Sequence, residues 1–293
     1  MNDGKLVILA GGVSSRMKKA VNPGENVDTR LINEADNKEK SMIGVGSDRR
    51  PFLDYLLFNA RESGYNDIVI VISEKSNAIK EHYGKKDSDN EFHGLNISYA
   101  VQRIPVGRVK PLGTADALYQ ALNVKKEWSG NKFTVCNSDN LYSQTALKLM
   151  LDSQHPNALI DYDRDALRFE SERIEAFAVI AKDEDHYVTD IIEKPTQAQV
   201  EAAKEDDGRI GVSMNIFSFS YDQILPYLKV VPLHPIRKEK EIPTALKMII
   251  TEHPKSVYAY PLSEHVPDLT SKTDISIVQK YLETHFPNTD FWD

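Results

Sequence analysis

The sequence predicts an α/β protein built on a doubly wound, mostly parallel (mixed) sheet with helices on both faces. β-prone apolar runs alternate along the chain with segments whose apolar residues recur at helical spacing. One run, 67–72, is almost continuously β-branched, which is typical of a strand covered on both faces of a parallel sheet. In the second half, the runs 176–181 and 188–192 are separated by a short charged turn, which predicts an antiparallel hairpin.

The remaining elements follow from the same two periodicities. We expect strands at 6–9, 67–72, 95–101, 132–136, 158–162, 176–181, 188–192, 212–219 and 257–261. We expect helices at 51–63, 114–122, 197–205, 242–251 and 275–284. The stretch 18–39 is polar and highly charged, so it predicts a long surface loop.

Composition restricts the classes of partner. The chain has 293 residues, 41% of them hydrophobic, which is enough for a large core. Its formal net charge of −8 argues against nucleic acid as a ligand, because no basic stripe could release phosphate counterions. We expect no signal peptide and no membrane span, since no apolar run approaches the roughly 20 residues that a span needs. The single cysteine, Cys136, excludes an internal disulfide, and we expect a cytoplasmic protein.

The first strand leads directly into a glycine-rich turn. Its apolar residues end at Leu9-Ala10, and Gly11, Gly12 and Arg16 follow. Glycines let backbone N–H groups approach an anion and adopt dihedrals that other residues avoid, while an arginine fork fits phosphate oxygens. The turn therefore predicts a phosphate site. An ordinary strand-to-helix turn with an exposed arginine is the open alternative.

Two acidic positions lie where strands or helices meet loops. Asp139 directly follows the strand at 132–136, and Asp268 precedes the last expected helix. A carboxylate at the carboxyl end of a buried strand faces the crevice where ligands bind and suits Mg²⁺. Both aspartates could equally be turn or helix-capping residues, so this alternative stays open.

Three further segments carry weaker signals. Gln102 ends a strand and offers a donor and an acceptor for a pyrimidine edge. Gly113 and Thr114 form a turn into a helix, with Thr114 as the expected N-cap. Glu193-Lys194-Pro195 ends the strand at 188–192, where the proline on its own indicates only a strand end.

Taken together, these motifs resemble one family, the sugar-1-phosphate nucleotidyltransferases, also called nucleoside-diphosphate-sugar pyrophosphorylases. The resemblance spans about 5–284. It depends on six ordered motifs: Leu9-Ala10-Gly11-Gly12 with Arg16, Lys40-Ser41-Met42-Ile43 before Arg50-Pro51-Phe52-Leu53, Pro111-Leu112-Gly113-Thr114-Ala115, Asp139-Asn140, Glu193-Lys194-Pro195, and Asp268-Leu269-Thr270. It implies one domain, 1–293, with a Rossmann-like nucleotidyltransferase fold. Residues 1–140 would be the nucleotide-binding half and 141–293 the sugar-phosphate-binding half.

The resemblance also implies roles for single residues and a Mg²⁺-dependent reaction of an NTP with a sugar-1-phosphate. Catalytic roles fall to Arg16, Lys40 and Lys194. Nucleotide binding falls to Ala10, Gly11, Gly12, Gln102, Gly113 and Thr114. Binding of the sugar phosphate falls to Glu193, Lys194 and Asn215, and metal binding falls to Asp139 and Asp268.

Several alternatives stay open. Lys18 or Lys19 could take the role assigned to Lys40, because the long segment 18–39 separates Lys40 from the glycine turn. The acceptor could be phosphocholine or a similar phospho-alcohol with CTP, on the same fold. The chain could also be a catalytically idle homologue that binds nucleotide or sugar. A homo-oligomer is left open, and no membrane or nucleic-acid partner is expected.

Overall fold

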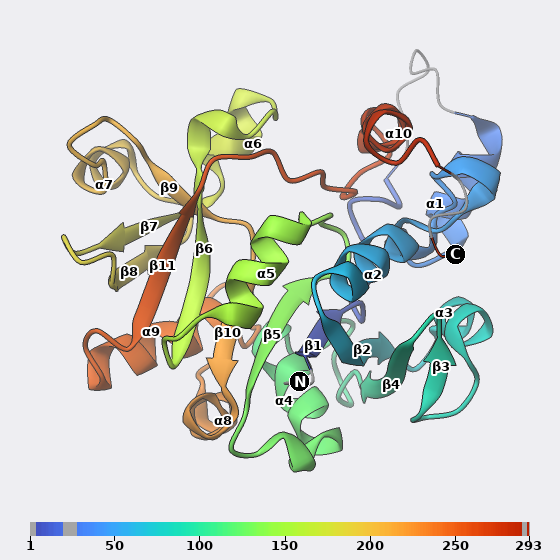
Figure 1. Cartoon of the computed structure of the whole chain (residues 1–293), viewed down its shortest axis with the longest axis horizontal. Coiled ribbons are helices and arrows are strands. Elements are labelled where there is room, and N and C mark those ends of the chain that lie inside the picture. Colours follow the sequence, from blue (N-terminus) through green and yellow to red (C-terminus); the bar gives the residue numbers. More distant parts are fainter. Residues whose placement is uncertain (1–3, 20–27, 289–291, 293) are drawn as a thin grey trace.

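A computed structural model of the chain describes residues 4–19, 28–288 and 292, and it contains one eleven-stranded mixed sheet between helical layers (Figure 1). The strands are β1 (Gly4–Leu9), β2 (Tyr65–Ser73), β3 (Asn90–Phe92), β4 (Leu95–Gln102), β5 (Lys132–Asn137), β6 (Asn157–Asp163), β7 (Ala178–Lys182), β8 (Val188–Ile192), β9 (Gly211–Ser213), β10 (Ile216–Ser220) and β11 (Val257–Leu262). The predicted mixed α/β sheet is confirmed.

Ten α-helices accompany these strands in the part of the chain that the structure describes. They are α1 (Thr29–Asn37), α2 (Phe52–Glu62), α3 (Asn77–Tyr83), α4 (Thr114–Val124), α5 (Gln144–Asp152), α6 (Ser171–Glu175), α7 (Gln197–Ala202), α8 (Tyr221–Val230), α9 (Ile242–Glu252) and α10 (Asp274–His285). Short 3₁₀ turns lie at Lys40–Met42, Ser47–Arg49, Lys126–Trp128 and Arg164–Ala166. Within the described ranges, none of these helices has the length and apolar character needed to cross a membrane.

Helices cover both faces of the sheet because the central strands are apolar on both sides. Leu6 and Ile8 of β1 pack into a core with α2 and α5, whereas Val7 packs on the other face against α4, α8 and α9. All three side chains are completely buried. This continuous burial is what the near-continuous apolar runs predicted.

The pairing of strands differs between the two halves of the chain. β1 pairs in parallel with β2 and β5, and β2 pairs in parallel with β4. Past β5 the ladder is mostly antiparallel, through β10, β6, β9, β7 and β8, while β11 pairs in parallel with β6. The predicted β7–β8 hairpin is confirmed. Because all carboxyl ends of β1, β2, β4 and β5 point the same way, their following loops gather at one edge.

Two local predictions are wrong. Residues 29–37 of the predicted loop 18–39 form α1, because Leu31 and Ala35 share one buried face and Asp28 caps the helix by accepting from Arg30 N; residues 20–27 lie outside the described part. The strand predicted at 212–219 is broken at Met214 and Asn215, where Asn215 has φ +59°. β9 and β10 therefore pair with β6 in different registers.

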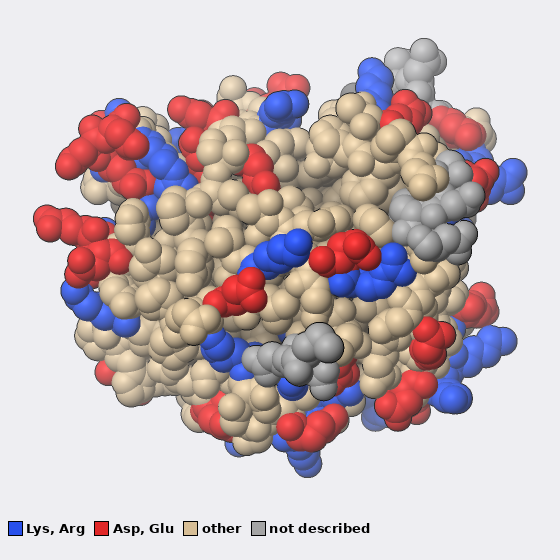
Figure 2. Space-filling model, viewed as in Figure 1, with Lys and Arg blue, Asp and Glu red and all other residues tan. Residues whose placement is uncertain are grey.

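The structure contains further elements that the sequence did not indicate, namely α3, α6, α8 and β3. On the face shown in Figure 2, the described lysine and arginine side chains are interspersed with acidic ones rather than gathered in a stripe.

Candidate active site

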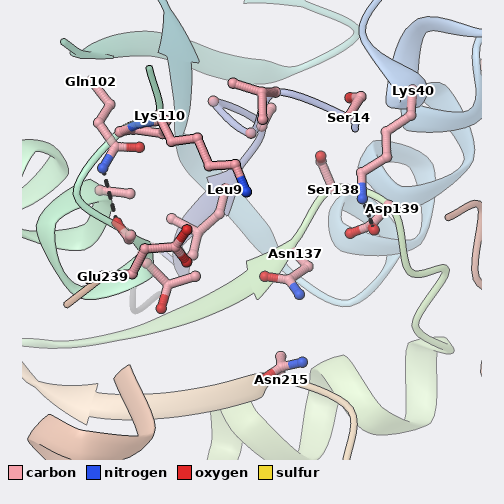
Figure 3. A pocket seen from close by; sticks show the side chains of 18 of the residues that line it. Leu9, Ser14, Lys40, Gln102, Lys110, Asn137, Ser138, Asp139, Asn215 and Glu239 are labelled. Atoms are coloured by element: carbon pink, nitrogen blue, oxygen red, sulfur yellow. Dashed lines mark hydrogen bonds and ion pairs between the residues drawn. The ribbon is translucent and has the colours of Figure 1, made fainter. Parts of the chain in front are cut away.

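One cleft lies beyond the carboxyl ends of β1, β4 and β5, with a volume of about 470 Å³ (Figure 3). The first half of the chain lines it with the glycine loop 9–16, residues 39–41, Gln102, parts of 110–117 and 137–139. The second half contributes Glu193, Asn215, Arg237, Glu239, Glu241, Pro243 and Thr270. Most of the residues singled out from the sequence, although far apart along the chain, therefore line a single cavity.

The glycine loop differs in one respect from the prediction. Neither Gly11 nor Gly12 has a positive φ; the left-handed residue of the loop is Ser14, with φ +52°. A Cβ on Gly11 would lie 3.4 Å from the carbonyl carbon of Ile72, which is an ordinary van der Waals contact, so packing alone does not require glycine there. A Cβ on Gly12 would meet nothing within 4 Å, so this residue leaves open space beside the loop backbone. Backbone N–H groups next to such space suit an anion.

Two cations near the glycine loop, Arg16 and Lys40, line the cleft, where they could meet a phosphate. Arg16 lines the cleft and is exposed, and its side chain makes no hydrogen bond or ion pair with any described residue. Lys40 also lines the cleft and forms an ion pair with Asp139. Lys18 and Lys19 are exposed and do not line the cleft. Among the three candidate lysines, position therefore favours Lys40.

Asp139 and Asp268 lie side by side. The backbone holds them together, since Asn140 and Asp268 form an antiparallel bridge and Leu269 N donates to Asp139 O at 2.8 Å. Thr270 Oγ1 lies 3.3 Å from Asp139 Oδ2 and 2.5 Å from Asp268 Oδ1. Burial raises the pKa of Asp268 above its usual range, and the Asp139 carboxylate raises it further, against the opposing effect of Arg173.

The helix-capping alternative does not hold for either aspartate. Ser143 caps α5 by accepting from Ala146 N, and the N-cap position of α10 is Thr273. Near α10 it is Asp274 that accepts from Thr270 N and Ser271 N. Asp139 and Thr270 line the cleft, and Asp268 adjoins them without lining it. Two adjacent carboxylates and a hydroxyl are hard oxygen donors, so they fit Mg²⁺. The metal would be held by Asp139 and Asp268.

A second group of possible metal ligands is already neutralised. Ligand atoms of Glu193, His234 and Glu241 lie within 4.8 Å of one another. However, Arg237 forms ion pairs with both carboxylates, at 2.6 Å to Glu241 Oε1 and a shorter contact to Glu193. Burial and then the Glu193 carboxylate raise the pKa of Glu241, while Arg237 lowers it. One guanidinium thus pairs with both of these carboxylates, whereas Asp139 and Asp268 pair with two different cations, Lys40 and Arg173.

Gln102 offers a ligand fewer hydrogen-bonding groups than the sequence suggested. Its Nε2 donates to Gly113 O at 2.9 Å and to Asp116 Oδ2 at 2.8 Å, so the amide N–H groups are used inside the protein. Only Oε1, an acceptor, remains for a ligand. The prediction that Gln102 offers both a donor and an acceptor to a base is therefore wrong for the donor, because two protein oxygens compete for it.

Gly113 connects the two halves of the cleft. Its φ is +109°, and a Cβ there would lie 2.4 Å from Lys240 O. Ala115 N also donates to Lys240 O at 3.0 Å. The prediction that Thr114 is the N-cap of α4 is wrong, because Gly113 is at that position and Thr114 Oγ1 instead accepts from Ile242 N at 3.1 Å.

The residues predicted to bind the sugar phosphate are only partly brought together. Glu193 and Asn215 line the cleft, and Asn215 lies at the break between β9 and β10. Lys194 is exposed and does not line the cleft: it sits in a turn with φ +49°, between Glu193 and Pro195. Cys136, by contrast, is a core residue whose burial raises its thiol pKa, as expected for an unreactive cysteine.

Several residues of the site were not found from the sequence. Lys110 and Glu239 project into the cleft (Figure 3), and Arg237 and Glu241 line it. Arg173 lies outside the cleft lining and forms ion pairs with Asp268 and Asp274. The sequence shows only an acidic residue directly before the apolar run of α9; the burial of this residue, Glu241, which is 7% exposed, is seen only in the structure.

The chain resembles known proteins in sequence and in fold. The chain is 25% identical over 218 residues to a glucose-1-phosphate adenylyltransferase of Hydrogenovibrio crunogenus, covering 73% of this chain and 47% of that protein. It thus spans about half the length of that relative. The crystal structure of a UDP-glucose pyrophosphorylase complexed with UDP-glucose has the same fold, with a TM-score of 0.69 at 16% identity, covering 97% of this chain and 100% of that one.

The family itself is established by the sequence. Residues 28–267 match the model of the nucleotidyl transferase family, which is most of the chain. The glycine loop before residue 28 and Asp268 lie outside the matched range, yet the structure places both next to residues within it, Lys40 and Asp139. The chain therefore belongs to the nucleotidyl transferase family.

Proposed function

We propose that this chain is a Mg²⁺-dependent nucleotidyltransferase that condenses an NTP with a sugar-1-phosphate to give an NDP-sugar and pyrophosphate. The observation that carries the proposal is the shared cleft, which Arg16, Lys40, Asp139, Glu193 and Asn215 all line although they come from both halves of the chain. Membership of the family and the likeness to a glucose-1-phosphate adenylyltransferase support this class of reaction.

In the proposed reaction, an oxygen of the sugar-1-phosphate attacks the α-phosphorus of the NTP in line. The new P–O bond forms as the bond to the β-phosphate oxygen breaks, and pyrophosphate leaves. The attacking phosphate is already ionised, so no general base is needed. Catalysis then consists of positioning two anions and stabilising the negative charge that spreads over the transferred group.

The side chains divide this work by position. The loop at Gly11 and Gly12 with Arg16 would hold the triphosphate, and Lys40 would stabilise the leaving pyrophosphate. Glu193 and Asn215 would bind sugar hydroxyls, with Lys194 reaching the sugar phosphate from the rim of the cleft. Mg²⁺ held by Asp139 and Asp268 would neutralise phosphate charge.

The base would lie at Gln102. Because only its carbonyl oxygen is available, we expect the base to present an N–H there, as N3–H of uracil or thymine does. The identity of the base and sugar is part of the proposal. The cytoplasmic location expected from the sequence stays a prediction.

The test is pyrophosphate release, measured over a panel of NTPs and sugar-1-phosphates with Mg²⁺. We expect turnover with at least one pair and its loss in Asp139→Asn and Lys194→Ala. Asp152→Asn is the matched control, since Asp152 is exposed at the end of α5 and does not line the cleft. Unchanged turnover in Asp139→Asn would overturn the proposal.

The same assay separates the alternatives. Turnover with CTP and phosphocholine but with no sugar-1-phosphate would assign a phospho-alcohol acceptor. Nucleotide binding without turnover on any acceptor would indicate an idle homologue.

A further inference from the structure

Arg173 links the short helix α6 to the loop that carries Asp268. Its Nη2 lies 2.6 Å from Asp268 Oδ2, and its Nη1 lies 2.6 Å from Asp274 Oδ1. Arg173 does not line the cleft, so it is not placed to touch substrate. One guanidinium thus holds two carboxylates, one of which is a proposed metal ligand.

The guanidinium is itself fixed on several sides. It lies over the Phe169 ring, 4.5 Å from the centroid, and the Arg173 side chain is 24% exposed. Asp274, which holds its Nη1, is fixed in turn by Thr270 N at 2.9 Å and Ser271 N at 2.6 Å. Because the guanidinium is planar and held on several sides, it fixes the orientation of the carboxylates that it binds.

Both oxygens of Asp268 therefore have fixed partners. Arg173 contacts Oδ2, and Thr270 Oγ1 contacts Oδ1. Asp139 is held differently, by Lys40, a lysine with a flexible stem that lines the cleft. Of the two carboxylates, Asp268 is the one held by a cation outside the cleft lining, Arg173.

We propose that Arg173 is a positioning residue, which fixes the Asp268 carboxylate in the orientation needed to bind the divalent cation. This inference rests on the proposed function, since it assumes that Asp139 and Asp268 bind the metal. Partners that orient metal ligands typically affect metal affinity by about 10- to 100-fold when they are removed. A purely structural role would instead lower stability and leave metal affinity unchanged.

The test is Mn²⁺ binding to the full chain, followed by electron paramagnetic resonance. We expect Arg173→Gln to raise the Mn²⁺ dissociation constant by about 10- to 100-fold. Arg173→Lys keeps the positive charge but loses the planar guanidinium. Its Mn²⁺ dissociation constant should therefore lie between those of the wild type and Arg173→Gln. Arg168→Gln is the matched control, because Arg168 lies in the same segment and no ion pair within the described residues involves its side chain. Its Mn²⁺ affinity should equal that of the wild type.

The outcomes separate the two proposals. If Asp139→Asn abolishes Mn²⁺ binding but Arg173→Gln binds Mn²⁺ as tightly as wild type, Arg173 has no positioning role and the proposed function stands. If wild-type protein binds no Mn²⁺, both the metal site and the role of Arg173 are wrong. Should Arg173→Gln fail to fold, the lysine variant decides: wild-type affinity there contradicts the inference, and weakened affinity supports it.

Discussion

The two halves of the cleft use their cations differently. In the first half, Arg16 and Lys110 line the cavity and their side chains make no ion pair with any described residue. In the second half, Arg237 is bound to Glu193 and Glu241, and Arg173 to Asp268 and Asp274. Arg16 and Lys110 are thus available to a bound anion, whereas Arg173 and Arg237 hold carboxylates, as Lys40 of the first half also does with Asp139.

The same contrast extends into the sheet. The strands of the first half bury apolar side chains on both faces with a few neutral polar ones such as Ser98 and Thr134, whereas the second half buries charge between its strands. Asp161 of β6 is completely buried and forms ion pairs with Lys182 of β7 and with Arg209, at 2.6 Å to Arg209. Glu205 contacts both cations, at 2.9 Å and 2.6 Å. Removing any one of these charges would leave a buried partner uncompensated, so the stability of the second half depends on all of them together.

The largest effect is expected from breaking this buried network. Asp161→Ala leaves Lys182 and Arg209 facing each other with one carboxylate fewer, so we expect the free energy of unfolding to fall by about 3–5 kcal/mol. Urea denaturation measures this. The control is Asp185→Ala, which removes an exposed aspartate paired with Lys255 and should leave the unfolding midpoint unchanged. Equal midpoints for all three proteins would contradict the contrast between the halves.

An available cation should affect turnover and not stability. Arg16→Gln removes an exposed guanidinium that has no partner among the described residues, so the unfolding curve should not change. If Arg16 stabilises the reacting phosphates, kcat/KM should fall by about 10²–10³-fold, which is about 2.7–4 kcal/mol of transition-state stabilisation.

Lys18→Gln is the control for this prediction. Lys18 is exposed close to Arg16 but does not line the cleft, so its kcat/KM should be that of the wild type. A large loss in Lys18→Gln together with no loss in Arg16→Gln would reverse the assignment of the loop cations.

Elements with a strong local pattern could be predicted from the sequence. β2 lies in the β-branched run 67–72, and α2 and α9 follow apolar residues at helical spacing. The break between β9 and β10 could not be predicted, because Asn215 adopts φ +59° in the middle of a stretch whose spaced apolar residues predict one uninterrupted strand. Asparagine tolerates that conformation, but the sequence does not show where a bulge lies.

The site divides in the same way. Arg16, Lys40, Asp139 and Glu193 occur in local motifs, and the structure places all four in the cleft. Arg173 and Arg237 have no such signal, since each pairs with a carboxylate that is distant in sequence, Asp268 and Glu193 respectively. These four cleft-lining residues lie in recognisable loops, whereas the arginines that hold carboxylates depend on tertiary packing.

Gly113 tests how closely the two halves must fit. Gly113→Ala would place a methyl group 2.4 Å from Lys240 O in a residue with φ +109°, so we expect a loss of about 2–3 kcal/mol in unfolding free energy. The shift of the Gly113 carbonyl should also release Gln102 and raise KM for the NTP. Gly107→Ala is the control: φ is +82°, but nothing lies within 4 Å, so only strain of about 1 kcal/mol is expected. Equal losses of unfolding free energy in Gly113→Ala and Gly107→Ala would show that the contact between Gly113 and Lys240 does not contribute to stability.

The smallest effect concerns pH and a histidine of the second half. Burial, together with Arg168 and Arg173, lowers the pKa of His265 to about 4. Its Nδ1 accepts from Arg168 N at 3.1 Å, an interaction that a proton on Nδ1 would remove. In the unfolded chain the pKa of His265 is about 6.5. Between pH 6.5 and pH 4 the unfolded chain therefore binds a proton that the folded chain does not. The stabilisation from neutral His265 is complete above about pH 6.5 and is lost as the pH falls toward 4.

Because the His265 ring is partly exposed, solvent reduces the full effect, and we expect a contribution of about 1–2 kcal/mol. His265→Gln keeps an acceptor for Arg168 N without a titrating group. Urea denaturation at pH 7 and pH 4.5 should therefore show a smaller loss of unfolding free energy in the variant than in the wild type. Equal losses would mean that the pKa of His265 is not lowered by folding, so that neither burial nor the neighbouring cations Arg168 and Arg173 act on this imidazole.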